Sequence, residues 1–294
     1  MTITAPQPPG TGPAPHHETV PPVKLWLCPN DALPPPVAGI LAAHWLDDRE
    51  NQTAARFLFE RDRRQYLVAH TLVRRALALE AGLAEAELVI WRSSRGRPFL
   101  QPLPGGLPRG GGHLDFNLSH AGGYSLLGIV RTQRIGVDVE CLDRESGALE
   151  TILTTFTPQE QHWAAQAPPG PRRDRRVLRL WTLKEAYSKA RGLGLGLPFD
   201  EFAFTLDDDR SVLAFQPPAD DTAGRWRFIE LEPVPGVLAA VAVPADDGGA
   251  PHLELHQGFP WHRAAPHTIA LPEPVGPPRP APHDPARTAL PAPL

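Results

Sequence analysis

One short segment, Gly-Val-Asp-Val-Glu at 136–140, carries two carboxylates that could hold a metal ion. Its residues alternate as those of a strand do, so Asp138 and Glu140 share one face at a separation of about 7 Å. Carboxylate oxygens in this arrangement suit Mg²⁺. The same alternation is also typical of the solvated face of a half-buried sheet, so this segment alone indicates no function.

A second segment, 181–189, places an acid and a base on one side of a helix. With 3.6 residues per turn, Glu185 and Lys189 project from one stripe below Trp181. Read alone, the pair is typical of a surface ion pair worth about 0.3 to 0.5 kcal/mol. If the helix packs against the strand at 136–140, however, three carboxylates and a lysine converge. That group would bind Mg²⁺ and place a proton donor beside it.

Together the two segments resemble the motifs of the 4'-phosphopantetheinyl transferases, (I/V)-G-(V/I)-D-(V/I)-E followed by W-(S/T)-x-K-E-(A/S)-x-x-K. The chain is similar to the Sfp-type branch of that family. Further segments resemble family blocks and follow in the family's order: a basic helix at 61–75, Arg-Gly-Arg-Pro-Phe-Leu at 95–100, Phe-Asn-Leu-Ser-His at 116–120, and Phe-Thr-Pro-Gln-Glu at 156–160. The resemblance covers about residues 23 to 243.

This resemblance implies an activity and a set of site residues. The family moves 4'-phosphopantetheine from coenzyme A to a serine of an acyl or peptidyl carrier protein, requires Mg²⁺, and releases adenosine 3',5'-bisphosphate. By resemblance the metal ligands are Asp138, Glu140 and Glu185, the catalytic base is Glu185, and the catalytic cation at the leaving bisphosphate is Lys189. The residues expected to contact coenzyme A are Arg56, Arg61, Arg97, Ser119, His120, Lys184 and Lys189. A helix-surface position for Lys184 fits the pattern equally well.

Two functions of other classes would use the same residues. One is a coenzyme A or nucleotide sensor that has the fold without the catalysis, and the other is a metal-dependent phosphohydrolase. A sensor has no need of a base, so the presence of Glu185 and Lys189 beside the two strand carboxylates favours the transferase.

The amino-acid composition indicates which partners the protein does not bind and which cellular compartment it occupies. The formal net charge of -4 argues against a general binder of nucleic acid or of anionic membranes, which needs a broad basic surface. Arginines do cluster at 61–64 and 172–179, a pattern more typical of a solvated helix face than of a binding patch. Two cysteines form no disulfide framework, and no apolar run is long enough to span a bilayer. We therefore expect a cytoplasmic protein, and a monomer is the simplest state.

Hydrophobic patterns and proline content divide the chain into four parts. Proline-rich tails without periodicity are expected to be disordered at 1–22 and 244–294, and trimming them should change stability by no more than about 0.5 kcal/mol. Between the tails, helices followed by strands occur twice, at 23–131 and 132–243, which predicts an α+β fold. The resemblance implies a pseudo-dimer of two similar α+β halves with coenzyme A in the cleft between them. Long helices are expected at 48–81, 148–165 and 174–191.

Overall fold

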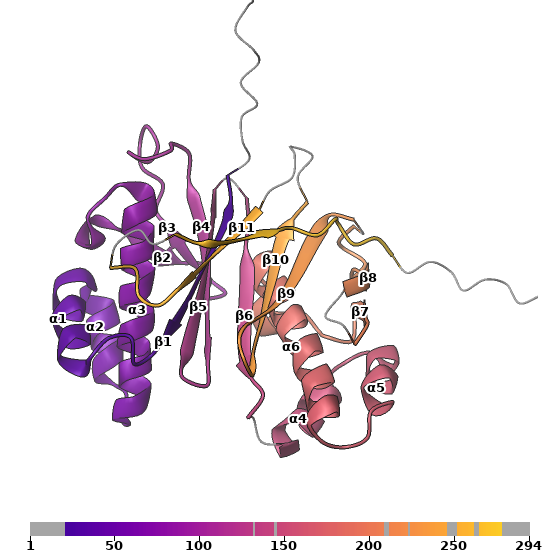
Figure 1. The fold of residues 1–294 in the computed structure, drawn as a ribbon. Helices are drawn as coiled ribbons and strands as arrows, with labels where there is room; N and C mark the ends of the chain where they lie inside the picture. Colours follow the sequence, from indigo (N-terminus) through magenta and orange to yellow (C-terminus); the bar gives the residue numbers. More distant parts are fainter. Residues whose placement is uncertain are drawn as a thin grey trace, which may run out of the picture.

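The structure, a computed structural model, describes residues 21–277 except 132, 144–145, 209–211, 223, 246–251 and 262–264. The fold is α+β, as predicted. Figure 1 shows helices packed against one sheet on the left, and further helices against a second sheet on the right. Nearly all of the predicted tail at 1–22, and the last 17 positions of the tail at 244–294, lie outside the described residues.

The N-terminal half contains a five-stranded sheet in the order β12–β11–β1–β5–β4, with α1 to α3 packed on one face. Two of these strands, β11 (His252–Gln257) and β12 (His267–Ala270), come from the C-terminal part of the chain. Buried side chains such as Leu72 and Leu77 of the third helix pack against Phe116 of β4. The elements up to the boundary between the halves are β1 (Val23–Pro29), α1 (Pro35–Trp45), α2 (Asp48–Ala55), α3 (Glu60–Ala81), β2 (Ile90–Arg92), β3 (Pro98–Leu100), β4 (Leu114–Ala121) and β5 (Tyr124–Arg131).

The helix predicted at 48–81 is two helices, α2 and α3. Asp47 caps α2 by accepting a hydrogen bond from Glu50 N at 2.8 Å. Arg74 of α3 donates back to Asp47 and Glu50 at 3.0 and 2.8 Å, so the start of α2 lies against the middle of α3. The chain must turn between the helices to allow this contact, and an apolar pattern alone does not reveal such a turn. Gly82, at φ 75°, ends α3 as predicted.

The C-terminal half is a three-stranded sheet in the order β6–β10–β9, against which α6 packs. Tyr187 of α6 is fully buried, with its ring centroid 5.0 Å from that of Phe202 and 5.2 Å from that of Trp226. The elements are β6 (Gly136–Cys141), α4 (Ser146–Leu153), α5 (Pro158–Ala165), α6 (Pro171–Arg191), β7 (Ala203–Leu206), β8 (Val212–Gln216), β9 (Trp226–Val234) and β10 (Val237–Pro244).

The helix predicted at 148–165 is also two helices, because α5 has its own start signal. Thr157 and Glu160 form a capping box, in which each side chain accepts from the other's backbone N–H. Pro158 fits the first position of a helix and cannot continue a preceding one. The third long helix, predicted at 174–191, is α6, which starts three residues earlier.

The two halves meet where the edge strands β4 and β6 run side by side. Asp115 and Asn117 of β4 accept hydrogen bonds from the backbone N–H groups of Ile135 and Val137, at 3.0 and 2.9 Å. On the other side of β6, α6 approaches so closely that a Cβ on Gly136 would lie 1.9 Å from the carbonyl oxygen of Ala186. Only glycine fits there, so this residue lets α6 lie directly on the strand that carries Asp138.

The prediction of a disordered tail at 244–294 is wrong for its described part. β11 (His252–Gln257) joins the N-terminal sheet parallel to β1, and β12 (His267–Ala270) pairs with β11. Alternating apolar residues explain why this segment is ordered, since Leu253 and Leu255 point into the core and are nearly fully buried. We call residues 252–261 and 265–277 the C-terminal strap.

The C-terminal strap contacts both halves. On the N-terminal half, the ring of Phe259 stacks on that of Trp45 at 6.4 Å, and Arg75 donates to the carbonyl oxygens of Pro260 and Trp261. The strap then crosses to the C-terminal half, as Figure 1 shows, where Val275 is buried and its N–H donates to Trp226 O at 3.3 Å. The high proline content led to the prediction of disorder, but the prolines flank these strands and do not interrupt them.

The arginines clustered at 172–179 form no basic patch. Each of them lies within 2.9 Å of a carboxylate on a neighbouring element: Asp208 for Arg172 and Arg176, Glu150 for Arg173, Glu232 for Arg175 and Glu230 for Arg179. These pairs tie α6 to the strands beside it. Across the part of the chain that the structure describes, no helix is both long and apolar enough to cross a membrane.

Candidate active site

Lys189 of α6 meets Asp138 of β6 at the boundary between the halves. The Nζ of Lys189 lies 2.6 Å from Asp138 Oδ1, whereas it lies 3.9 Å from Glu185. Ser119 of β4 donates from its Oγ to the same Oδ1 at 2.7 Å and accepts from Lys189 at 3.1 Å. The three residues therefore come from three elements and both halves. The structure thus brings together three of the predicted site residues, Ser119, Asp138 and Lys189.

The other two predicted acids lie beside this group. Glu185 is buried on the face of α6 that meets β6, and Glu140 accepts a hydrogen bond from the indole N–H of Trp181 at 3.1 Å. Burial raises the pKa of Glu185, and the negative charges of Asp138 and Glu140 raise it further, while Lys189 opposes the shift. The three carboxylates are thus close enough to repel one another.

They do not form a ready-made metal site. In the described part of the chain, no group of three or more acidic, histidine or cysteine side chains is arranged to hold a metal ion. The predicted convergence of Asp138, Glu140 and Glu185 on one ion is not preformed, because Lys189 occupies one oxygen of Asp138 and Trp181 holds Glu140. The second oxygen of Asp138 is nevertheless buried and accepts no hydrogen bond. An unpartnered carboxylate oxygen beside a buried acid is an arrangement that a cation would stabilise.

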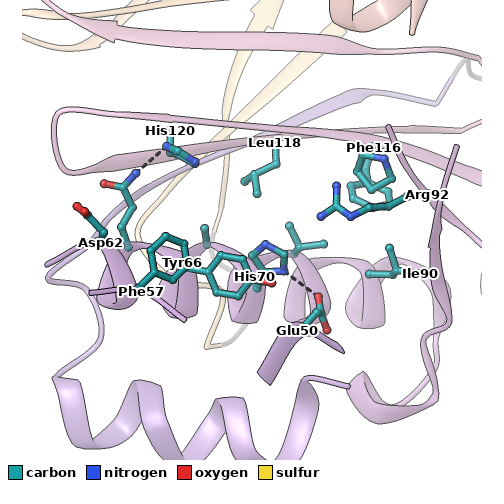
Figure 2. Close-up of a pocket in the computed structure, with 14 residues that line it drawn as sticks. Glu50, Phe57, Asp62, Tyr66, His70, Ile90, Arg92, Phe116, Leu118 and His120 are labelled. Carbon is teal, nitrogen blue, oxygen red and sulfur yellow. Dashed lines mark hydrogen bonds and ion pairs between the residues drawn. The ribbon is translucent and has the colours of Figure 1, made fainter. Parts of the chain in front are cut away.

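A pocket of about 480 Å³ lies between α3, the β2–β3 hairpin and β4 (Figure 2). Successive side chains of β4 point to opposite faces, so Ser119 faces Asp138 while His120 lines the pocket. His120 Nδ1 lies 2.6 Å from Gln65 Nε2. Burial and the nearby charge of Lys189 lower the pKa of His120. The predicted residue His120 thus stands where the pocket and the carboxylate group meet.

Several lining residues of the pocket escaped the sequence analysis. Tyr66 and His70 stack at 3.9 Å on the α3 side, and Arg92 faces them from β2. A signal for Arg92 existed, because residues two apart in a strand share a face, so Arg92 lies on the same face of β2 as the apolar Ile90. No comparable signal marks His70, whose Nδ1 pairs with Glu50 Oε1 at 2.8 Å across two helices.

Arg97 is a structural tie at the boundary. Its side chain is buried, and its terminal nitrogens donate to Asp115 Oδ2 at 2.5 Å, to Ile135 O at 2.9 Å and to the carbonyl oxygen of Lys189. These contacts hold the hairpin loop against both β4 and the end of α6. Both terminal nitrogens are thus engaged, whereas the buried Nε–H of Arg97 has no hydrogen-bond partner among the described residues.

Lys184 was expected either in the coenzyme A site or on the helix surface, and both expectations are wrong. Its side chain is fully buried and pairs with the equally buried Glu160 at 2.9 Å. It also donates to the carbonyl oxygens of Phe199 and Phe202, each at 2.6 Å. Lys184 points into the core because it lies about 100° around the helix from Glu185, on the side that α5 and the loop before β7 cover.

Arg56 and Arg61 are exposed and lie near the two ends of the loop between α2 and α3. Arg61 pairs with its neighbour Asp62 at 3.1 Å, and Asp62 lines the pocket. Both arginines are sequence neighbours of residues that line the pocket, Phe57 and Asp62, but neither lines it itself. We call this edge of the pocket its mouth.

Comparisons with known proteins identify the family of the chain. The family model of the 4'-phosphopantetheinyl transferase superfamily matches residues 134–243, and that of the 4'-phosphopantetheinyl transferase N-terminal region matches 34–130. A phosphopantetheinyl transferase of Thraustochytrium sp. is 32% identical over 70% of this chain and 73% of its own. The 4'-phosphopantetheinyl transferase HetI of Nostoc sp. is 30% identical over 75% of this chain and 87% of its own.

The fold and these matches define the class of protein. It is an α+β enzyme of the transferase class, built from two halves whose boundary carries the polar site. The chain belongs to the 4'-phosphopantetheinyl transferase family.

Proposed function

We propose that this protein transfers 4'-phosphopantetheine from coenzyme A to a serine hydroxyl of an acyl or peptidyl carrier protein. The observation that carries the proposal is the group formed by Ser119, Asp138, Glu185 and Lys189 next to a pocket of nucleotide size. Carboxylates alone would suit many functions. A lysine that is paired with one of them suits a reaction that creates negative charge on phosphate oxygens.

The pocket is the proposed site for the nucleotide end of coenzyme A. Its aromatic side chains offer stacking surface, and Arg92 and His120 offer N–H donors for phosphate oxygens. Arg56 and Arg61 at the mouth would add positive charge near the entering phosphates. The charge of Lys189 acts on His120, so the two side chains are close enough for a molecule held by His120 to reach Lys189 with its next phosphate.

In the proposed reaction the carrier serine oxygen attacks the phosphorus that bears the pantetheine arm. Its bond to that phosphorus forms as the bond to the bridging pyrophosphate oxygen breaks, and adenosine 3',5'-bisphosphate leaves. Glu185 accepts the serine proton, a role helped by the raised pKa that burial gives its carboxyl group. Lys189 stabilises the negative charge on the leaving oxygen, and Ser119 and Asp138 hold the ammonium in place.

We also propose Mg²⁺ as the cofactor, held by Asp138 and Glu185 with Glu140 close by. The unpartnered oxygen of Asp138 and the mutual repulsion of the three carboxylates support this assignment. When bound, the ion would neutralise charge on the pyrophosphate oxygens. We further propose that the protein is a cytoplasmic monomer. It is expected to bind neither nucleic acid nor membranes, since the net charge is -4 and the arginines of α6 are paired with carboxylates.

Incubation with coenzyme A, Mg²⁺ and an apo carrier protein tests the function by mass spectrometry. We expect the carrier to gain one phosphopantetheinyl group, and we expect Glu185→Gln to slow that gain by about 10²- to 10⁴-fold. Glu273→Gln, which changes an exposed carboxylate of the C-terminal strap, is the matched control. Hydrolysis of coenzyme A without labelling would indicate a phosphohydrolase instead, and binding without either reaction would indicate a sensor.

A further inference from the structure

His120 is the last member of a short chain of hydrogen-bonded side chains from three elements. Asn30, which follows β1, donates from Nδ2 to Gln65 Oε1 of α3 at 3.3 Å. Gln65 Nε2 in turn lies 2.6 Å from His120 Nδ1, the contact drawn as a dashed line at His120 in Figure 2. The backbone of Asn30 is fixed, because its N–H donates to Gly123 O at 2.7 Å in the turn after β4, while its side-chain Oδ1 is buried without a hydrogen-bond partner.

The direction of each hydrogen bond follows from the one before it. An amide nitrogen only donates and an amide oxygen only accepts, so the Asn30 nitrogen requires the Gln65 oxygen to face it. The Gln65 nitrogen must then face His120, and it needs an acceptor there. His120 Nδ1 is therefore the unprotonated nitrogen, and a neutral ring carries its proton on Nε2.

We propose that Gln65, oriented by Asn30, is a positioning residue that fixes His120 as the Nε2–H tautomer, so that His120 donates to a phosphate oxygen of coenzyme A. This inference rests on the proposed function only for the identity of the acceptor. Without the chain of amides, either ring nitrogen of His120 could carry the proton, and the ring could turn away from the phosphate. Gln65 acts through His120 and need not touch the substrate.

The charges around His120 are consistent with a neutral ring. Burial, Lys189 of α6 and His70 of α3 lower the pKa of His120, whereas a hydrogen bond to its own backbone and Asp138 of β6 raise it. The other charged side chains that line the same pocket are Glu50, Asp62 and Arg92. Lys189 is the largest of the charge effects and opposes protonation, as does burial. Next to the cation Lys189, His120 is then a neutral donor. This combination binds phosphate without two adjacent positive charges that would repel each other in the free enzyme.

Nitrogen NMR of isotope-labelled histidine rings tests the tautomer directly. A His120→Asn variant assigns the His120 signal among the 12 histidines. We expect Nε2–H in the unmodified protein, and Nδ1–H or a charged ring in Gln65→Glu, whose carboxylate can only accept. Asn30→Leu, which frees the Gln65 amide to turn over, should give a mixture of both tautomers. An Nδ1–H ring in the unmodified protein, or a signal unmoved in both variants, would overturn the proposal.

Coenzyme A binding provides the second measurement. Gln65→Leu should weaken coenzyme A about 10-fold, which corresponds to about 1.4 kcal/mol, the range of one hydrogen bond to a charged group. In a His120→Asn background the same change should have no further effect, because the two residues act as one unit. Gln52→Leu, at an exposed position of α2, is the matched control. Additive losses would mean that Gln65 does not act through His120.

These results separate the two proposals. The tautomer is measured on the free protein, so it stands or falls without any reaction. If the expected tautomer is present but the unmodified protein neither binds coenzyme A nor labels a carrier, the proposed function fails and the arrangement of His120 remains.

Discussion

The buried pair of Lys184 and Glu160 offers a direct test of how α6 is held. Lys184→Met fills nearly the same space but removes the ammonium group that bridges α6, α5 and the loop before β7. Burial lowers the pKa of Lys184 to about 8, so at neutral pH the amine is mostly protonated and the ion pair is intact. The substitution therefore leaves Glu160 as a fully buried carboxylate without its cation.

The expected loss follows from what remains around Glu160. Breaking a buried ion pair from one side costs about 3 to 5 kcal/mol. Glu160 keeps three donors, namely Phe204 N at 2.9 Å, Thr157 N at 3.0 Å and Thr157 Oγ1 at 2.8 Å. Because these bonds still stabilise the carboxylate, we expect the lower end of the range, about 3 kcal/mol. The double variant Lys184→Met/Glu160→Gln should be more stable than Lys184→Met alone, since no unpaired charge is buried.

Urea unfolding at pH 7 measures these differences as shifts of the midpoint at constant slope. Lys24→Met is the matched control, because Lys24 pairs with Glu80 at a similar distance of 2.7 Å but is partly exposed. That control should lose no more than about 1 kcal/mol. If Lys184→Met lost as little as the control, or if the double variant were the less stable one, the pair would not hold α6 as the structure indicates.

Further predictions concern the strap, the site and the effect of pH. A chain ending at Ala245 lacks the C-terminal strap and should lose at least about 3 kcal/mol of stability, because several buried apolar side chains are removed; an unchanged melting temperature would contradict this. Lys189→Ala should slow single-turnover labelling of an apo carrier more than it weakens coenzyme A binding measured by calorimetry, and equal losses would assign the lysine to binding alone. Asp138→Ala should raise the Mg²⁺ concentration needed for labelling, and an unchanged requirement would exclude Asp138 as a ligand. Burial lowers the pKa of His256 in the folded protein, so the unfolded chain binds the proton more readily. The free energy of unfolding should therefore fall as pH drops below about 6.5. His256→Phe, which keeps a ring stacked on Trp26, should reduce that pH dependence in acid unfolding curves.

The sequence by itself determined which residues of one strand or one helix share a face. Alternation along 136–140 put Asp138 and Glu140 on one face, and the helical period put Glu185 and Lys189 on one stripe, both without reference to the rest of the chain. Turn and cap residues were equally local, as the end of α3 at Gly82 illustrates. The α+β class followed from the order of such elements.

Only the tertiary structure decided which elements meet and what lies between them. The helical period placed Lys189 beside Glu185, and convergence with the strand carboxylates depended on packing; in the structure Asp138 is the nearer partner, at 2.6 Å against 3.9 Å for Glu185. That choice depends on how closely α6 approaches the strand, which Gly136 permits and no pattern along the helix records. The burial of Lys184 and the ordering of the C-terminal strap have the same origin. Each depends on partners distant in the sequence, and a contact between distant segments is a property of packing that local periodicity does not contain.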